Sequence, residues 1–275
     1  MTRRLRRGGE GMRDDHAGWL ATNCIIPQWE APPGVHALFT TRGGGFSQGV
    51  YASLNLGLHV GDDPAVVHRN RGVLRRCLPA EPRWLEQVHG NRVLDADLDE
   101  AAFVEAPPPA DGVLSRRAGV VCGVMTADCL PVLLCDDAGT VVAAVHAGWR
   151  GLAEGVLETA VVAMAVEPRG IRAVLGPAIG PTAFEVGGEV RDRFIDADPA
   201  AAEAFVASRN DAKWMADLFA LARRRLECAG VERVFGGQWC THADPSRFFS
   251  YRRDGATGRM AALVWLEAKA TRSGY

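Results

Sequence analysis

The chain has 275 residues, enough for one large domain or two small ones, and its 48% hydrophobic content supports a sizeable core. Its formal net charge is −2, with no dominant basic block outside the N-terminus, which argues against nucleic acid as the main partner. No apolar stretch is long enough to span a membrane. Neither an internal repeat nor an interdomain linker is visible, so residues 21–275 are predicted to form a single domain.

The N-terminal segment is charged, polar and rich in glycine. Its sequence, MTRRLRRGGEGMRDD, lacks the apolar region of a secretory signal, so we expect none. Residues 1–20 are predicted to form a poorly ordered tail. The seven cysteines are scattered and odd in number, which predicts a reducing cytoplasm as the location and no disulfide framework.

The first half of the chain predicts two strands, a helix and a hairpin. Residues 34–41 form an apolar strand that runs into Arg42 and three glycines, a loop type that can hold an anion. Residues 53–56 alternate like a short strand, and residues 65–78 have helical spacing after Asp63-Pro64. Residues 83–89 and 92–98 are predicted to pair around Gly90-Asn91, directly after His89.

A buried hairpin is predicted at the centre of the chain. Two strongly apolar runs, residues 130–135 and 140–145, flank the turn Asp136-Asp137-Ala138-Gly139. Cys129 precedes the first run and His146 follows the second. Because these ends lie side by side in an antiparallel pair, the two side chains should be neighbours. A thiol beside an imidazole indicates either a metal site or a nucleophile with its base.

The rest of the chain alternates helices with short strands. Helices are predicted around residues 152–166, 189–195, 200–206 and 216–228, the last of them ending at Gly230. Strands are predicted over 172–175 and 231–235, and a final hairpin joins 248–252 to 259–266. Between them, the loop 176–181 combines glycine and proline in a way that suits close backbone approach to a ligand, although a simple crossover loop needs the same residues.

Three candidate metal ligands, His89, Cys129 and His146, each stand at the end of a predicted strand. Catalytic zinc commonly has three protein ligands and one open position. Spacing alone does not establish this set, because neither CxxC pairs nor HExxH occur.

Motifs spread over nearly everything beyond the N-terminal tail carry a family resemblance. They are FTTRGG at 39–44, SLNLG at 53–57, QVHG at 87–90, TADCLPVLL at 126–134, VHAGWRG at 145–151, LGPAIGP at 175–181, FEVG at 184–187 and FFSYRRDGATGR at 248–259. Together they resemble the bacterial laccase-domain, or multicopper polyphenol oxidoreductase, family, whose members are also described as purine nucleoside phosphorylases. The resemblance implies an α+β fold of mixed sheets flanked by helices, an α/β/β/α sandwich similar to some cysteine hydrolases.

The resemblance also implies a function and a ligand set. It implies that His89, Cys129 and His146 bind one zinc, and that the protein phosphorolyses adenosine, inosine and methylthioadenosine, with adenosine deaminase activity in some members. Purine nucleosides and phosphate are then the expected partners, and the oligomeric state stays open. The predicted substrate-binding residues are Arg42, Asn55, Arg150, Arg252 and Arg253.

Cys129 and His146 are also predicted to take part in the chemistry, together with Asp128, the nearest carboxylate in sequence and our first candidate for a proton shuttle. Its alternative role is to bind backbone or to orient a histidine. Glu185 is a weaker candidate for the shuttle.

Other functions stay open from the sequence. A copper site with Met125 as a distant axial ligand is one, although the paired HxH motifs of multicopper oxidases do not occur. A hydrolase with Cys129 as nucleophile and His146 as base, such as an amidase that edits peptidoglycan precursors, is another. The third is a binding protein without catalysis.

Overall fold

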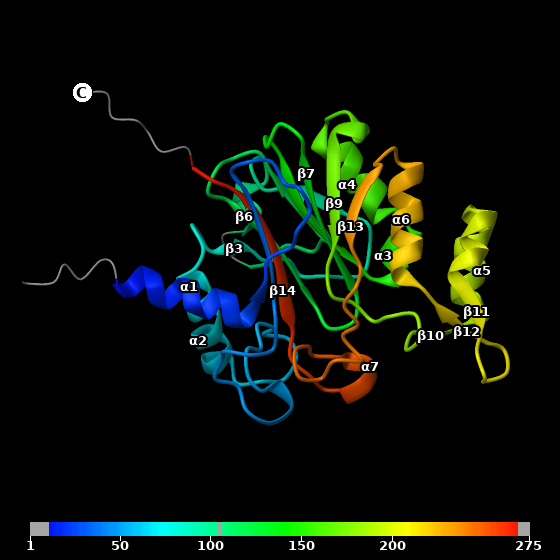
Figure 1. Ribbon diagram of the computed structural model, residues 1–275, viewed down its shortest axis with the longest axis horizontal. Coiled ribbons are helices and arrows are strands. Elements are labelled where there is room, and N and C mark those ends of the chain that lie inside the picture. Colours follow the sequence, from blue (N-terminus) through cyan, green and yellow to red (C-terminus); the bar gives the residue numbers. More distant parts are fainter. Residues whose placement is uncertain (1–10, 104–105, 269–275) are drawn as a thin grey trace, which may run out of the picture.

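The computed structural model describes residues 11–103 and 106–268, and two β-sheets packed face to face form its centre (Figure 1). One is a five-stranded sheet in the order β1 (Cys24–Ile25), β2 (Val35–Thr40), β14 (Met260–Leu266), β6 (Val121–Thr126) and β3 (Pro82–Arg83). The other is a six-stranded sheet in the order β13 (Arg233–Gly236), β9 (Ile171–Leu175), β7 (Leu130–Asp136), β8 (Val142–Ala147), β5 (Gly112–Ser115) and β4 (Val93–Asp95). Each contains both parallel and antiparallel pairs.

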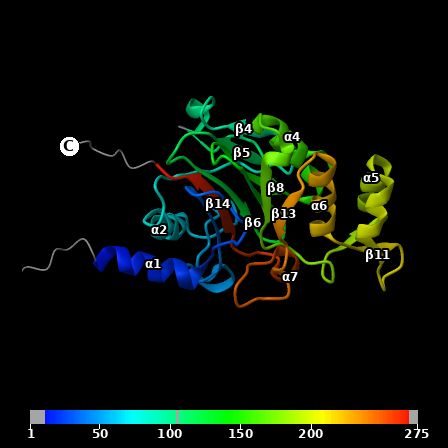
Figure 2. The same cartoon turned by 45° about the horizontal axis from the view of Figure 1, so that its top comes forward.

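Helices cover the outer face of each sheet, as Figures 1 and 2 show from two directions. Apolar residues of α1 (Gly11–Asn23) and α2 (Pro64–Arg75) pack on the five-stranded sheet. Those of α3 (Trp149–Ala153), α4 (Val156–Met164) and α6 (Leu218–Cys228) pack on the six-stranded sheet. The layers are therefore helix, sheet, sheet, helix, and the predicted α/β/β/α sandwich is confirmed.

Strand β7 shows why its sequence is an unbroken apolar run. Leu130, Val132 and Leu134 face the helices of the outer layer, whereas Leu133 and Cys135 face the other sheet. Because both faces of the strand are buried, both sets of alternating side chains must be apolar. The same reasoning holds for β14, whose seven residues are nearly all buried.

The predicted central hairpin is confirmed. Strands β7 and β8 pair antiparallel, with Pro131 opposite His146. The Asp136 carboxylate closes the turn by accepting the Thr140 N–H at 2.6 Å and the Val141 N–H at 3.0 Å. Cys129 therefore lies one residue beyond the paired strand, next to His146.

A smaller three-stranded sheet projects from the sandwich together with α5 (Gly188–Ala197) (Figure 1). Its strands, in order, are β10 (Glu185–Gly187), β12 (Lys213–Ala216) and β11 (Phe205–Ala207). Short 3₁₀ turns occur at Gly49–Tyr51, Glu100–Phe103, Pro168–Gly170 and Pro199–Ala204. The last of these replaces most of the helix predicted over 200–206. A final short helix, α7 (Tyr251–Asp254), precedes β14.

The prediction of a disordered tail over residues 1–20 is wrong for residues 11–20, which belong to α1. The Trp19 indole N–H donates to the Gly44 carbonyl at 3.1 Å, and Trp19 and Leu20 pack against the core beneath the five-stranded sheet. These long-range contacts hold the helix in place although its own sequence is polar. Residues 1–10 lie outside the described residues.

Two predicted hairpins are wrong because tertiary hydrogen bonds compete with the pairing. Strands β3 and β4 join different sheets, so the segment that carries His89 crosses between the sheets. Residues 251–254 form α7, whose N-cap is Ser250, and β14 pairs with β2 and β6 instead.

Two further elements differ from the prediction. Residues 53–56 form no strand, because the Asn70 side chain takes the carbonyls of Ser53 and Asn55 that a partner strand would bind. The helix predicted over 152–166 is interrupted at Gly155, which has a φ of 88°.

Candidate metal centre and substrate pocket

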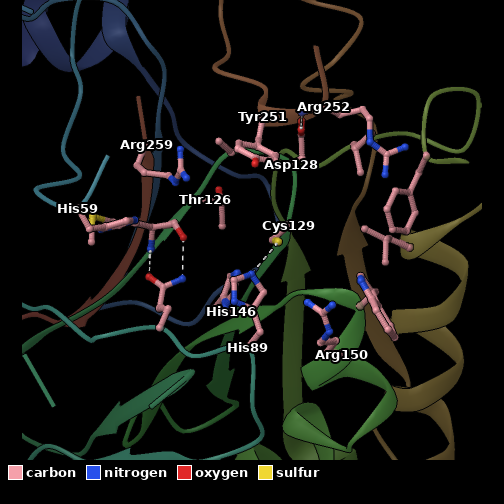
Figure 3. A pocket seen from close by; sticks show the side chains of 17 residues that line it. His59, His89, Thr126, Asp128, Cys129, His146, Arg150, Tyr251, Arg252 and Arg259 are labelled. Carbon is pink, nitrogen blue, oxygen red and sulfur yellow. Dashed lines mark hydrogen bonds between the residues drawn. The ribbon is translucent and has the colours of Figure 1, made fainter. Parts of the chain in front are cut away.

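His89, Cys129 and His146 converge at one point, as predicted (Figure 3). One potential ligand atom from each lies within 4.8 Å of the other two. The Cys129 Sγ is 3.8 Å from the His89 Nε2, and the two imidazole rings meet edge to face with centroids 4.8 Å apart. Among the described residues, this is the one group of three or more His, Cys, Asp or Glu side chains with such spacing.

Each of the three side chains comes from a different segment. Cys129 lies just before β7, His146 is near the end of β8, and His89 lies in the crossing between β3 and β4. The rigid hairpin therefore fixes two of them. His89 is in a left-handed conformation, with a φ of 61°, and its side chain is exposed at the surface.

Asp111, which was not among the predicted site residues, makes hydrogen bonds to His146 and to the segment that carries His89. It is fully buried, and its Oδ1 lies 2.8 Å from the His146 Nδ1. Its two carboxylate oxygens also accept the backbone N–H groups of Val88, His89 and Gly90. A single carboxylate thus contacts the segments that carry two of the three candidate ligands.

Mutual contacts shift the ionisation of these groups. Burial raises the pKa of the Cys129 thiol, but the adjacent His146 and His89 outweigh burial and lower that pKa to about 6. Burial lowers the pKa of His146, yet Cys129 and Asp111 raise it to about 9. Burial also opposes ionisation of Asp111, but its hydrogen bonds keep the pKa below the usual range. In the metal-free protein, a thiolate beside an imidazolium is therefore the favoured state.

The donor set and its spacing fit a metal ion. Two imidazole nitrogens and a thiolate are ligands that zinc and copper accept. With Zn–N of about 2.0–2.1 Å and Zn–S of about 2.3 Å, tetrahedral geometry places sulfur and nitrogen about 3.6 Å apart. The observed separation of 3.8 Å between Cys129 Sγ and His89 Nε2 is close to that value.

Gly148 leaves free space beside all three ligands. A Cβ atom at this position would lie 3.0 Å from His89 Cδ2, 3.2 Å from Cys129 Sγ and 3.4 Å from His146 Cε1. These separations are shorter than ordinary contacts, so any side chain here would crowd the group. The glycine therefore keeps open the room into which the three donors point.

The metal group forms part of the wall of a cavity of about 520 Å³, a size typical of small-molecule sites. One part of the cavity wall is apolar or aromatic: Ala127, Trp149, Ile179, Phe184, Leu218 and Tyr251. Three arginines also line it, Arg150, Arg252 and Arg259 (Figure 3). A cavity that combines an apolar wall, guanidinium groups and a metal set can hold an aromatic anion, or an aromatic molecule together with an anion.

Two of the predicted substrate-binding residues line this cavity. Arg150 lies with its guanidinium 4.8 Å from the centre of the Trp149 ring. Arg252 donates to the Glu185 carbonyl at 2.8 Å and stands over the Phe184 ring. Both remain candidates for a phosphate contact.

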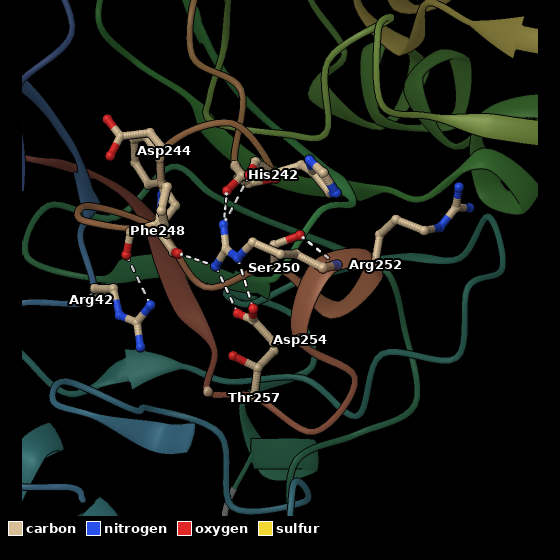
Figure 4. Close-up of polar contacts among 12 residues, drawn as sticks. Arg42, His242, Asp244, Phe248, Ser250, Arg252, Asp254 and Thr257 are labelled. Atoms are coloured by element: carbon tan, nitrogen blue, oxygen red, sulfur yellow. Dashed lines mark hydrogen bonds and ion pairs between the residues drawn. The ribbon is translucent and has the colours of Figure 1, made fainter. Parts of the chain in front are cut away.

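Three other predicted substrate-binding residues are not among those that line the cavity. Arg253 donates to the carbonyls of residues 241, 242 and 248 and pairs with Asp254. Figure 4 labels three of these partners, His242, Phe248 and Asp254. Arg42 donates to the carbonyls of residues 52 and 245. Asn55 is fully buried and binds residues 57, 62 and 259. Their polar groups hold loops together in this structure, and the substrate contacts predicted for them stay predictions.

The Asp128 carboxylate lines the cavity and is heavily hydrogen-bonded. It accepts the Thr241 hydroxyl at 2.5 Å, the Ser250 hydroxyl at 3.0 Å and the Arg252 N–H at 2.7 Å. These bonds tie the start of β7 to the segment that carries α7. Asp128 therefore anchors a cavity wall in this structure, and its predicted proton transfer stays a prediction. Glu185 is not among the lining residues, because its carboxylate binds Ser208 and Asn210.

Sequence reasoning missed several residues of the cavity, above all His59 and Arg259 (Figure 3). Burial, followed by the nearby Arg259 and Arg71, lowers the pKa of His59. Asn55 accepts the Arg259 backbone N–H at 2.9 Å, so the buried asparagine positions this arginine. His59 lies just after the motif SLNLG, and Arg259 is the last residue of DGATGR. No local pattern indicates that these two segments meet.

The fold and the site define an α/β/β/α protein with one His-Cys-His candidate metal centre in a small-molecule cavity. Residues 36–267 match the family described as multi-copper polyphenol oxidoreductase laccase, and the chain belongs to this family. The resemblance seen in the sequence is thereby confirmed.

Relatives with closely similar sequences carry the name purine nucleoside phosphorylase. Purine nucleoside phosphorylase PA4543 of Pseudomonas aeruginosa is 53% identical over 243 residues, which cover 88% of this chain and 98% of that protein. Purine nucleoside phosphorylase YfiH of Escherichia coli is 53% identical over 244 residues, with the same coverage. The chain is also similar to the crystal structure of Neisseria meningitidis protein NMB0706, with a TM-score of 0.85 and 51% identity over 90% of this chain and 100% of that one.

A more distant solved structure has the same fold. YlmD from Geobacillus stearothermophilus is 34% identical, with a TM-score of 0.79 over 89% of this chain and 100% of that one. Among the residues that the structure describes, no helix combines the length and apolar character needed to cross a bilayer.

Proposed function

We propose that this protein is a zinc-dependent purine nucleoside phosphorylase that acts on adenosine, inosine and methylthioadenosine. The observation that carries the proposal is one cavity in which the His-Cys-His group, three arginines and an aromatic wall lie together. The names of relatives at 53% identity support the same activity. Purine nucleosides and phosphate are the proposed partners, and a reducing cytoplasm is the proposed location because all seven cysteines are free.

The proposed reaction exchanges one bond at the sugar. The bond between ribose C1′ and purine N9 breaks, its electron pair goes to N9, and a phosphate oxygen forms the new bond to C1′. The products are the free base, which takes up a proton, and ribose 1-phosphate, or 5-methylthioribose 1-phosphate when methylthioadenosine is the substrate. The site must therefore hold an anion, orient the base and supply a proton or a strong hydrogen bond to it.

Side chains of the cavity suit these three tasks. The guanidinium groups of Arg150, Arg252 and Arg259 can bind phosphate. Phe184 and Tyr251 present ring faces or edges to a flat base. His89, Cys129 and His146 would hold zinc, which when bound supplies a Lewis acid.

The test is a nucleoside panel with the zinc-loaded protein, with and without phosphate. Free base and the corresponding sugar 1-phosphate should appear in equal amounts and only when phosphate is present. Free base together with free ribose would indicate a hydrolase, and absence of any base would contradict the proposal. Deamination of adenosine, which stays a prediction, is measured in the same samples as ammonia and inosine formed without phosphate.

A second candidate function rests on Asp111. With His146 Nδ1 2.8 Å from this carboxylate and Cys129 beside the same ring, the metal-free group resembles a nucleophile, a base and an orienting acid. This arrangement favours a cysteine amidase, such as one that edits peptidoglycan precursors. Amide hydrolysis by the metal-free protein that a thiol reagent blocks would favour the amidase, whereas phosphorolysis that requires zinc favours the first proposal.

A copper oxidoreductase has weaker support. The Met125 sulfur, proposed as a distant axial ligand, lies 3.9 Å from an Arg71 guanidinium nitrogen and is occupied by that contact. An intense visible colour on loading with copper is the observation that would favour this alternative.

A further inference from the structure

Asp111 is a buried acid whose side-chain hydrogen bonds all go to His146 or to the segment that carries His89. It immediately precedes β5, in the six-stranded sheet, and has no exposed surface. Its side chain is bound to His146 and to three consecutive N–H groups of residues 88–90. Its own carbonyl accepts the His146 N–H at 2.7 Å. Side chain and backbone of one residue thus contact one ligand residue, His146, twice.

The contact with His146 selects which ring nitrogen can bind a metal. A carboxylate accepts hydrogen bonds, so the His146 Nδ1 carries the proton and donates it to Asp111 Oδ1 across 2.8 Å. When the ring gives up its second proton to bind a metal, its lone pair is then on Nε2, on the side that faces Cys129 and His89. A metal-binding histidine is commonly fixed in this way by a carboxylate on its other nitrogen.

The contacts with residues 88–90 fix the position of the other histidine. Asp111 Oδ1 accepts the His89 N–H at 3.0 Å, and Oδ2 accepts the Gly90 N–H at 2.7 Å. His89 has a φ of 61°, a conformation that costs a non-glycine residue free energy and persists only where surrounding contacts impose it. The Gly90 carbonyl also packs closely against α3 at Gly151. A Cβ atom on Gly151 would lie only 2.4 Å from that carbonyl oxygen.

We infer that Asp111 is the positioning residue of the metal centre, which fixes the His146 tautomer and the His89 backbone together through one carboxylate. The inference deepens the proposed function and rests on its zinc site. It does not depend on which substrate the protein converts, because what Asp111 controls is the affinity for the metal.

The main experiment measures zinc affinity by competition with a chelating dye in three proteins: wild type, Asp111→Asn and Asp136→Asn. Asparagine at 111 can still accept the N–H groups of Val88 and Gly90 through its one amide oxygen. Its NH₂ then takes the place of Oδ1, loses the bond from the His89 N–H and donates to His146 Nδ1, which favours a ring with the proton on Nε2 and no lone pair there for zinc. The expected result is a zinc Kd about 10- to 100-fold weaker than that of wild type.

Asp136→Asn is the matched control. Asp136 is also a buried acid of the six-stranded sheet. It accepts two N–H groups and one hydroxyl at the turn of the β7–β8 hairpin, at the opposite end from Cys129 and His146. Its loss should lower the unfolding temperature without changing the zinc Kd. Equal zinc affinity of folded Asp111→Asn and wild type would overturn the inference, as would an equal loss in both variants.

A measurement on the unmodified protein keeps the inference testable if Asp111→Asn fails to fold. In ¹⁵N-resolved NMR of the zinc-loaded wild type, the His146 ring should carry its proton on Nδ1, protected from exchange with water. A proton on Nε2 would overturn the inference. If wild type binds no zinc, the metal part of the proposed function fails with it, whereas zinc binding without phosphorolysis refutes only the proposed reaction.

Discussion

Gly148→Ala tests whether the space among the three candidate ligands is needed for metal binding. The backbone of Gly148, with φ −60° and ψ 154°, is accessible to alanine, so the substitution adds a methyl group without backbone strain. That methyl group would approach the His89 ring to 3.0 Å and the Cys129 sulfur to 3.2 Å. Either the methyl group or the ligands must move by a few tenths of an ångström.

The size of the effect follows from the cost of overpacking. Extra methyl groups in a packed site cost about 1–3 kcal/mol, and zinc sites tolerate shifts of only about 0.2 Å in ligand distance. If the strain is released by displacing a ligand, zinc affinity should fall about 5- to 150-fold, since about 1.4 kcal/mol corresponds to a factor of ten. The stability of the metal-free protein should change much less.

The assay is zinc competition with a chelating dye, together with thermal unfolding of the metal-free protein. Gly72→Ala is the control, because a Cβ there meets no atom within 4 Å and lies in helix α2. It should leave the zinc Kd unchanged and raise stability slightly. Unaltered zinc affinity in Gly148→Ala would show that the space beside the three ligands is not where the metal binds.

Four further predictions concern the same cavity. Cys129→Ser should abolish both zinc retention and phosphorolysis, measured by metal analysis and release of base. After the metal is removed with a chelator, Cys129 should react with iodoacetamide at a rate that falls as the pH drops below about 6, since only the thiolate reacts, and added zinc should protect it. Asp128→Asn should lower stability by about 1–3 kcal/mol through its three donors; a 10²- to 10⁴-fold loss of kcat at unchanged stability would instead establish proton transfer. Arg150→Ala should raise the KM for phosphate about 10- to 150-fold with a smaller change in kcat, and an unchanged KM would exclude a phosphate contact.

The central hairpin was predictable because its signals are local. Two apolar runs define β7 and β8, and residues 136–139 (Asp-Asp-Ala-Gly) form the turn between them. Pairing of the two strands then brings Cys129 next to His146. His89 could be added only through the family resemblance, because the hairpin predicted around it does not form. The sequence shows only that His89 follows an alternating stretch. The position of its side chain is decided by long-range contacts, which the sequence pattern does not reveal.

The roles of the arginines could not be read from their chemistry alone. A guanidinium group has five N–H donors, and whether these bind a ligand or the protein depends on which carbonyls surround it. Arg253 is surrounded by three carbonyls and Asp254, whereas Arg150 faces the cavity. In the sequence, both are simply arginines in a motif.

Asp111 could have been found only from the pairing of β5 with β8. Gly112 lies opposite Val145, so continuing the antiparallel register by one residue brings Asp111 next to His146. Residues 110–112 by themselves indicate no more than a turn. The signal is therefore the register of two strands that are about thirty residues apart, which local pattern does not determine.

Backbone strain links the three segments of the site. His89 and Asp128, the residue before Cys129, both have positive φ values, 61° and 93°. Each is held by hydrogen bonds from distant segments: His89 through Asp111, and Asp128 through residues 241–252. Such conformations cost free energy and persist where the surrounding structure imposes them. Since those contacts join segments that are distant in the sequence, variants that loosen either anchor should weaken metal binding before they unfold the sheets.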